Sequence, residues 1–457
     1  MENIESSIGV ELEFLLCIAE SDQQISTPER FKHSGAPFIL PPGVSRYSVI
    51  TERVQTRLRS TIENALSSLP KPGDRVIQSE NEALADVESL HLRPYVNWTI
   101  GTDTTVHLDP GSEKEEHVSE YRWYSTEIAS PALWATEASW NEIRAVVQAI
   151  KDEFWIFTPI NSGMHYHYGH GKYYIPFQKL RRMAALLVAV DPLMVQLHPE
   201  HRRMNDYCLS NRLYSRVAHG RSAESISRDL GAEYIEATPE IPCRKPRPEL
   251  VSRPVRKRTP ELGVPFKRGE LTGYKFSRAI FRDSGFDRDN TRAPRPLEIP
   301  RAVSEILRCM NAPTVAELMR YGPQEDHRPA YSFLMYGVQF YKHVIRSRGQ
   351  ANVDYQDKRT VEFRQMASTM EPEEVVAHGK VVVRLCEFAS EADIHDLWKV
   401  VFDCTEAESH GDWYDIFDLL AELGLNSEAK VLHSAVARFR GEKTMKAQTL
   451  GELNVEE

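Results

Sequence analysis

The chain has 457 residues, a net charge of −10 at pH 7, 41% hydrophobic residues and six cysteines. This length suits one large domain or two fused ones, and the hydrophobic fraction suffices for a packed core, which excludes a globally disordered chain. No apolar run reaches the length of a membrane span, and Glu11 and Glu13 interrupt the apolar N-terminal stretch, so we expect neither a transmembrane helix nor a signal peptide. The cysteines lack Cys-x-x-Cys spacing, which predicts reduced thiols in a cytoplasmic protein.

Basic residues are concentrated in one Pro-rich stretch. Between Arg244 and Arg301 there are 16 Lys and Arg residues but only 7 Asp and Glu residues. This stretch is either a solvated loop or a binding surface for a polyanion, and the charge pattern does not choose between them. Because the protein as a whole is acidic, we do not expect nucleic acid or a membrane to be its partner.

The predicted elements alternate between strands and helices without a regular rhythm. The first part is predicted to contain, in chain order, a strand over 7–18, a helix around 52–68, strands over 96–107 (with a turn at Gly101) and 122–130, and a helix over 138–154. Then follow a strand over 163–169, a helix over 177–197 interrupted near Pro192, an irregular segment over 240–300, a helix over 327–347, a strand over 359–367 and successive helices over 371–440. This order of strands and helices, together with the absence of a Gly-rich phosphate-binding motif, predicts an α+β fold with an antiparallel sheet.

Three predicted strands each carry two polar residues separated by one apolar residue. The pairs are Glu11 with Glu13, His165 with His167, and Glu362 with Arg364. Side chains two residues apart on a strand point to the same face, so each of these strands is polar on one side and apolar on the other. Taken singly, the pairs have plainer interpretations: a solvated strand edge, a structural or zinc-binding histidine pair, and a cross-strand charge pair.

The combination of the three pairs indicates a metal-dependent site. Glu127, in a fourth predicted strand, adds a further carboxylate. Carboxylates gathered on one face repel one another, and divalent cations remove that repulsion. Carboxylate oxygens with an imidazole suit Mg²⁺ or Mn²⁺, and an arginine beside them suits a phosphate oxygen. Phosphoryl transfer from ATP needs these groups together.

These motifs resemble those of glutamine synthetase. The resemblance lies in GVELEF at 9–14, in the Glu-Ile-Ala segment that begins at Glu127, in NSGMHYHYG at 161–169 and in RTVEFRQ at 359–365. HPEHRRMNDYC at 198–208 and TVEFRQMAST at 360–369 resemble the amidoligase branch of the glutamine-synthetase-like carboxylate–amine ligase superfamily. The resemblance implies a curved antiparallel sheet with a polar concave face and helices on the other face. It implies a catalytic domain over 1–370, with insertions at about 20–95 and 240–300, and a C-terminal helical region over 371–457 packed on it.

The resemblance also implies roles for individual residues. Two or three Mg²⁺ or Mn²⁺ ions are expected on Glu11, Glu13, Glu127, His165 and Glu362. ATP is expected to contact His167, Arg359 and Arg364, although Arg359 has the wrong parity for the polar face. Arg364, Glu362 and Asp103 are the expected catalytic residues, and Arg202, Arg203, Asn205 and Tyr207 the expected substrate-binding residues. Ala135 stands where glutamine synthetase has a further metal-binding Glu, so the sequence does not decide whether a third ion binds.

The predicted function is that of an ATP-dependent carboxylate–amine ligase, which forms an amide or peptide bond through an acyl phosphate. Three alternatives remain: a guanidino-kinase-like phosphotransferase on the same fold, a zinc-dependent hydrolase, and a binding relative without catalytic activity. The substrates are expected to be a small-molecule or peptide carboxylate and an amine. Neither their identity, nor the general base, nor the oligomeric state follows from the sequence.

Overall fold

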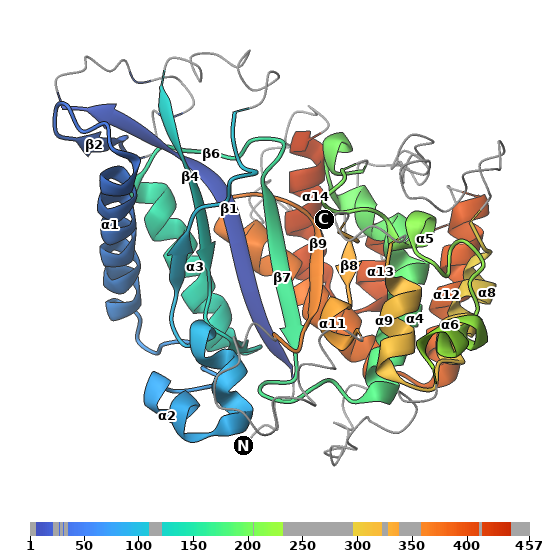
Figure 1. The fold of residues 1–457 in the computed structure, drawn as a ribbon. Helices are drawn as coiled ribbons and strands as arrows, with labels where there is room; N and C mark the ends of the chain where they lie inside the picture. The colour runs from blue at the N-terminus through green and yellow to red at the C-terminus, as the bar shows by residue number, and fades with distance from the viewer. Residues whose placement is uncertain are drawn as a thin grey trace, which may run out of the picture.

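The computed structural model describes residues 6–21, 27, 31, 35–108, 121–203, 205–231, 296–321, 328–337, 358–410 and 414–439. These residues form one large open sheet, with helices behind it and a further group of helices beyond its β8 edge (Figure 1). The mixed α+β class with an antiparallel sheet is therefore confirmed. The basic stretch from Arg244 to Arg301 lies outside the described residues up to position 295.

The sheet is built around the first strand of the chain. The main path of hydrogen-bonded neighbours runs β3-β4-β1-β7-β9-β8, and β2, β5 and β6 pair with β1 beside this path. Among the strands that the structure describes, the pairings are antiparallel except that of β1 with β2. The strands are β1 (Ser7–Glu20), β2 (Phe38–Leu40), β3 (Thr99–Gly101), β4 (Arg122–Ala129), β5 (Leu133–Trp134), β6 (Ile156–Phe157), β7 (Gly163–Gly169), β8 (Tyr331–Ser332) and β9 (Val361–Ala367).

The register of the central strands aligns their polar residues. Glu13 of β1 lies opposite Glu127 of β4, and Glu11 lies opposite His165 of β7. On the other side of β7, His167 lies opposite Glu362 of β9. Because residues opposite one another on neighbouring strands share a face, these pairings bring all the predicted polar pairs to one side of the sheet.

The helices form a layer behind the sheet and a bundle beside it. They are α1 (Tyr47–Ser67), α2 (Glu80–Ala85), α3 (Glu137–Glu153), α4 (Phe177–Met194), α5 (Asn211–Tyr214), α6 (Ala223–Leu230), α8 (Ile299–Leu307), α9 (Ala312–Met319), α11 (Pro372–Glu391), α12 (Ile394–Ser409), α13 (Ile416–Glu422) and α14 (Asn426–Phe439). Short 3-10 turns are η2 (Val87–Tyr95), η5 (Val195–Leu197), η6 (Glu200–Arg202) and η9 (Leu334–Tyr336). None of the described helices is both long and apolar enough to cross a membrane.

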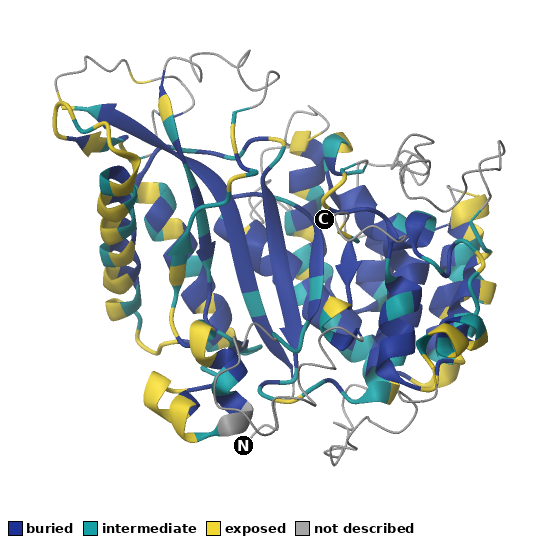
Figure 2. Cartoon of the chain, in the orientation of Figure 1, coloured by how far each residue is buried: buried dark blue, intermediate teal, exposed yellow. Residues whose placement is uncertain are grey.

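One hydrophobic core joins the sheet to these helices. Helix α11 packs against β1, β7, α3, α4 and α14, and α4 packs against α8 and α12. The apolar face of the sheet supplies Leu12 and Tyr166 to this core, and helices after residue 370 supply Val381 and Leu432. Figure 2 shows buried central strands and a helix α1 whose outer side is exposed. The domain boundary expected at residue 370 stays a prediction, and the hydrophobic core includes residues on both sides of that position.

Three predicted elements differ in the structure. The helix expected over 327–347 is wrong where the chain is described, because Tyr331 and Ser332 pair with β9 as strand β8 and a single 3-10 turn follows. The strand expected over 96–107 is reduced to Thr99–Gly101, which pairs with β4 before the chain turns. Helix α4 continues through Pro192 and becomes a 3-10 turn only after Met194. Tertiary pairing and packing decide these segments rather than local pattern.

Candidate active site

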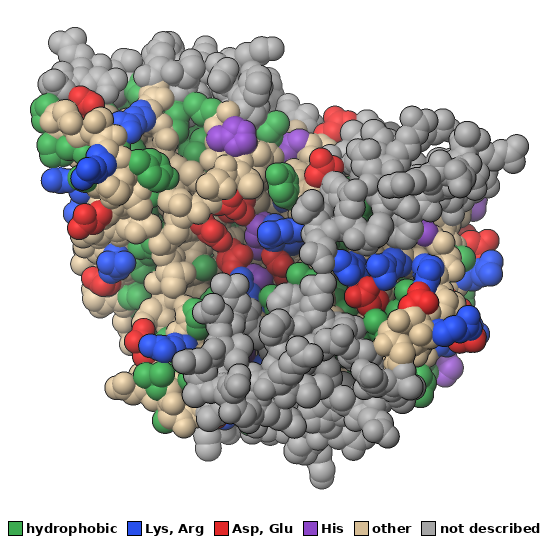
Figure 3. Space-filling view, viewed as in Figure 1, with side chains coloured by type: hydrophobic (Ala, Val, Ile, Leu, Met, Phe, Trp, Pro, Cys, Tyr) green, Lys and Arg blue, Asp and Glu red, His purple; other side chains and the backbone are tan. Residues whose placement is uncertain are grey.

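The polar face of the sheet forms the floor of a cavity of about 590 Å³. Acidic side chains, with a histidine and a cation beside them, gather near the centre of the face shown in Figure 3. The floor residues are Glu11, Glu13, Asp103, Glu127, His165, His167, Lys358, Thr360, Glu362 and Arg364. A wall beside β9 is formed by α9 and by the segment around β8 and η9. A cavity lined by this many ionisable groups is a candidate active site.

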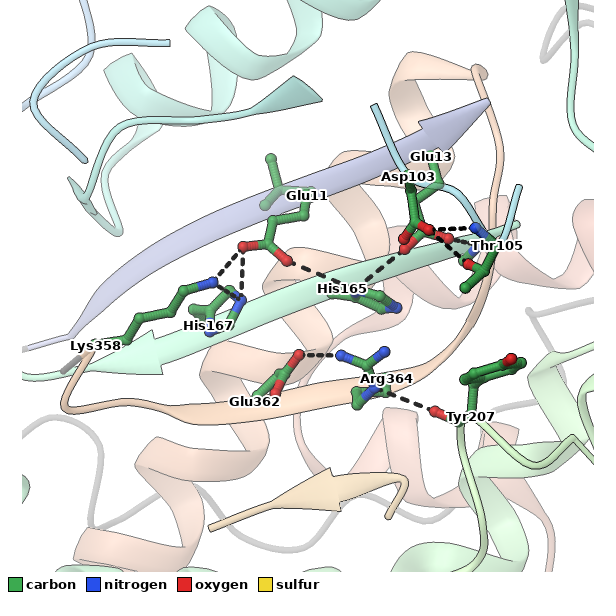
Figure 4. Close-up of polar contacts among 12 residues, drawn as sticks. Glu11, Glu13, Asp103, Thr105, His165, His167, Tyr207, Lys358, Glu362 and Arg364 are labelled. Atoms are coloured by element: carbon green, nitrogen blue, oxygen red, sulfur yellow. Dashed lines mark hydrogen bonds and ion pairs between the residues drawn. The ribbon is translucent and has the colours of Figure 1, made fainter. Parts of the chain in front are cut away.

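Glu11, His165 and Glu362 form a first set of metal-ligand atoms. One ligand atom from each lies within 4.8 Å of the others. Nδ1 of His165 lies 3.6 Å from Oε2 of Glu11 and also 3.6 Å from Oε1 of Glu13 (Figure 4). These atoms come from the three adjacent strands β1, β7 and β9. Two carboxylates and one imidazole at this separation fit a divalent cation that prefers oxygen ligands.

Glu13, Glu127 and Asp103 form a second acidic group at the other end of the floor. Oε2 of Glu13 accepts a hydrogen bond of 2.6 Å from the backbone N–H of Gly163. A side chain at position 163 would collide with the ring of His165, because a Cβ there would lie 2.9 Å from Nε2. Oδ1 of Asp103 accepts hydrogen bonds of 2.7 Å from both the backbone N–H and the hydroxyl of Thr105.

Burial and mutual repulsion oppose ionisation in this second group. Burial raises the pKa of Glu127 to about 7, and the negative charges of Glu11 and Asp103 add to the effect. Burial also raises the pKa of Glu13 to about 7, although the N–H of Gly163 opposes it. Carboxylates with such raised pKa values gain from a neighbouring cation.

Glu362 is charged because Arg364 lies beside it. Burial alone would raise the pKa of Glu362, but Arg364, His167 and His165 lower it to about 2. Nη1 of Arg364 donates to Oε1 of Glu362, and its Nε donates to the carbonyl oxygen of Tyr207 over 3.1 Å. The guanidinium also lines the cavity, so it can reach a ligand there.

The segment from His198 to Cys208 supports β9 instead of lining the cavity. The guanidinium of the buried Arg202 donates to the carbonyl oxygens of Arg364, over 2.7 Å, and Gln365, over 3.3 Å. Arg203 donates to the carbonyl oxygen of His198 over 3.3 Å. Oδ1 of Asn205 accepts from the backbone N–H of Tyr207 over 2.8 Å. Among the described lining residues none of the expected substrate contacts Arg202, Arg203, Asn205 and Tyr207 appears.

Arg359 turns away from the floor, as its parity indicated. Its guanidinium lies over the ring of Tyr174, 4.7 Å from the centroid, and Nη1 donates to the carbonyl oxygen of Lys172 over 2.8 Å. Arg359 is not among the described residues that line the cavity. The expected contact of Arg359 with a nucleotide is therefore not supported by its position.

Sequence reasoning missed Lys358 and the wall beside β9. Lys358 has the same parity as Thr360, Glu362 and Arg364, so extending the alternation by two residues towards the N-terminus would have found it. This wall contains Arg320 and Arg328 together with the apolar Phe333, and its sequence has no local pattern that points to a site. Its position depends on the pairing of β8 with β9.

Fold and site together describe an α+β protein with an acidic, histidine-containing cavity on one face of an antiparallel sheet. The family model described as "Putative amidoligase enzyme" matches residues 5–236, half of the chain. The chain belongs to this amidoligase family, as the resemblance predicted, and the family indicates an enzyme of the ligase class. The matched region includes Glu11, Glu13, Asp103, Glu127, His165 and His167 but ends before β9. No curated protein and no solved structure matches the chain.

Proposed function

We propose that this amidoligase-family protein is an ATP-dependent carboxylate–amine ligase with a glutamine-synthetase-like fold. In this proposal, the γ-phosphoryl group of ATP passes to a substrate carboxylate, and an amine then attacks the acyl phosphate to give an amide and phosphate. The supporting observation is that five carboxylates, two imidazoles and Arg364 lie together on the floor of one cavity. Phosphoryl transfer depends mainly on positioning and on charge stabilisation, which these groups can supply.

The acidic floor fits two divalent cations. Glu11, His165 and Glu362 would hold the ion nearer the ATP phosphates, and Glu13 and Glu127 the ion nearer the substrate carboxylate, with Asp103 beside them. Mg²⁺ or Mn²⁺ ions bound there would neutralise the negative charge that the nucleotide and the carboxylate bring together. A third ion is not supported near Ala135, because the nearby Glu137 is exposed and pairs with Lys380.

The protein's own groups would bind and orient the reactants. Arg364 is ion-paired with Glu362 and would stabilise the phosphoryl group in transit. Asp103 is fixed by Thr105 and is the proposed acceptor of the proton that the attacking ammonium releases. Phe333, Leu334 and Met335 give the wall beside β9 an apolar part, on which the nucleotide base could lie.

The test is to incubate the protein with ATP, Mg²⁺ and pooled amino acids, and to search for an amide product by mass spectrometry. Hydroxylamine in place of the amine should trap the acyl phosphate as a hydroxamate, and the nucleotide product should be ADP. A phosphorylated product without amide formation would instead indicate a kinase. Turnover that needs Zn²⁺ but no ATP would indicate a hydrolase, and AMP with pyrophosphate would contradict the acyl-phosphate route.

A further inference from the structure

Lys358 brings a cation into the acidic floor. Its Nζ donates to Oε1 of Glu11 and lies 3.3 Å from Nε2 of His167. It also lies 5.4 Å from the centroid of the Tyr95 ring. The side chain is 23% exposed, and Lys358 is one of the residues that line the cavity. An ammonium group has three donors, so it can contact Glu11 and still bind a ligand.

Glu11 presents its two oxygens to different partners. Oε1 faces Lys358 and lies 3.1 Å from Nε2 of His167, whereas Oε2 lies 3.6 Å from Nδ1 of His165. Figure 4 shows these contacts on opposite sides of the Glu11 carboxylate. The Lys358 contact therefore leaves the oxygen that faces His165 and Glu362 accessible to a metal ion. A cation at Lys358 and a metal ion on the first ligand set are compatible.

Arg359, the residue after Lys358, has an unusual backbone conformation. Arg359 has a φ angle of 49°, and among the described residues it is the only non-glycine residue with a positive φ. A left-handed conformation is unfavourable for a residue with a Cβ, so the surrounding contacts must stabilise it. Arg359 is fixed by the Tyr174 ring, by the Lys172 carbonyl and by the hydroxyl of Tyr336, which donates to the Arg359 carbonyl over 2.9 Å. Its two neighbours, Lys358 and Thr360, both contact His167.

We propose that Lys358 is a phosphate-binding cation of this site and that Arg359 is its positioning residue. This inference rests on the proposed use of ATP. Lysine binds phosphate as a mobile point charge, so its backbone must be fixed if the charge is to stay in place beside Glu11 and His167. The contacts of Arg359 supply that fixation on the side of the strand that faces away from the cavity. Strain at a residue next to the site, supported by three separate contacts, is typical of a functional constraint.

The test compares the affinity for a nucleotide with the affinity for Mn²⁺, both measured on the full chain. Binding of a β,γ-methylene analogue of ATP is measured by calorimetry with Mg²⁺ present, and binding of Mn²⁺ alone is measured by electron paramagnetic resonance. Lys358→Met should weaken nucleotide binding by about tenfold or more, because a charge-assisted contact is lost. Its Mn²⁺ affinity should not fall, because Glu11 loses a competing cation. Lys358→Arg should recover part of the nucleotide affinity.

Arg359→Gly should weaken nucleotide binding severalfold while leaving Mn²⁺ binding unchanged, since glycine accepts the positive φ but lacks the contacts with Tyr174 and Lys172.

Lys430→Met, at an exposed position of α14, is the control and should bind like wild type. Equal nucleotide affinity for wild type and Lys358→Met overturns the inference, and so does a matching loss of Mn²⁺ affinity. Wild-type affinity in Arg359→Gly overturns the positioning role. If the wild-type protein binds no analogue, the proposed function itself fails.

Discussion

Glu362 takes part both in the candidate metal site and in the ion pair with Arg364. It belongs to the metal-ligand set with Glu11 and His165, and it is ion-paired with Arg364. Glu362→Gln keeps the volume but removes one charged ligand. We expect turnover to fall by about 100-fold or more, the order of loss when one electrostatic stabiliser is removed from an active site. The measurement is amide formation under saturating ATP and Mg²⁺.

The fold of the Glu362→Gln protein should remain intact by circular dichroism. Glu137→Gln is the matched control, because Glu137 is exposed and pairs only with Lys380 among the described residues. It should retain nearly full turnover. Wild-type turnover in Glu362→Gln would mean that Glu362 is a structural charge partner of Arg364 and not a metal ligand.

The acidic floor also predicts that nucleotide binding depends on metal. Glu11 and Glu362 have pKa values below their usual range, despite burial, so both are negatively charged at neutral pH. The five carboxylates of the floor outnumber its two cations, Lys358 and Arg364, so the floor repels a triphosphate, and divalent cations reverse the interaction. An ATP analogue should therefore bind more tightly with Mg²⁺ than with a chelator, by about tenfold or more. Calorimetry measures both affinities, and equal values would exclude a metal bridge between protein and nucleotide.

At the scale of elements, the segment before β3 is tied to α3 by one buried carboxylate. Glu142 is fully buried and accepts from the backbone N–H of Gly73, from both terminal nitrogens of Arg75 and from Nε1 of Trp98. Trp98 directly precedes β3, which leads to Asp103. Removing one partner of a buried ion pair leaves the other charge without compensation. The Glu142 contacts thus stabilise the fold and position Asp103 together.

Glu142→Ala should lower the free energy of unfolding by about 3–5 kcal/mol, the usual loss when a buried ion pair is broken. Urea unfolding monitored by tryptophan fluorescence measures this change. Glu224→Ala is the control, because its partner Arg228 is largely exposed and surface pairs contribute little. If both variants unfold at the same urea concentration, the Glu142 contacts do not stabilise the fold.

A buried histidine pair joins α11 to the segment that supports β9. The rings of His198 and His378 stack with centroids 5.3 Å apart. Burial lowers the pKa of His378 to about 3, and burial together with His378 lowers the pKa of His198 well below its usual value. The His378 ring is therefore neutral in the folded protein at pH 5, and the lowered pKa of His198 acts in the same direction, whereas unfolded histidine takes up a proton below about pH 6.5. The unfolded state then binds more protons, so stability falls as the pH falls.

Between pH 6 and pH 4 the neutral His378 ring should cost up to about 1.4 kcal/mol of stability per pH unit, and His198 should add to the slope in the same direction. Urea unfolding at several pH values in this range measures the slope. His378→Gln should show a shallower slope than wild type, because one proton fewer is taken up on unfolding. Identical slopes would show that His378 is not a neutral, buried group in the folded protein.

Across the whole molecule, features that depend on residues close together in the sequence were predicted, and features that depend on distant residues were not. Glu11, Glu13, His165, His167, Glu362 and Arg364 were predicted to share a face because parity along a strand is local, and the registers bring these residues together. Arg202 was expected to contact substrate, but its guanidinium bonds to the backbone of β9. A basic side chain looks the same in sequence whether it faces a ligand or a carbonyl group. The wall around β8 was missed because two residues of strand are too short to produce a pattern.

The order of strands also determines when the site can form during protein synthesis. β1 is made first, yet β9, which supplies Glu362 and Arg364, pairs with β7 only after the ribosome has passed residue 367. Until then β7 has an open edge, and Glu11, Glu13, Glu127 and His165 have no arginine from β9 beside them. Such long-range pairings form slowly because the intervening chain must first close a large loop. Nascent chains therefore pass through a long interval in which they carry most of the acidic residues but no complete site.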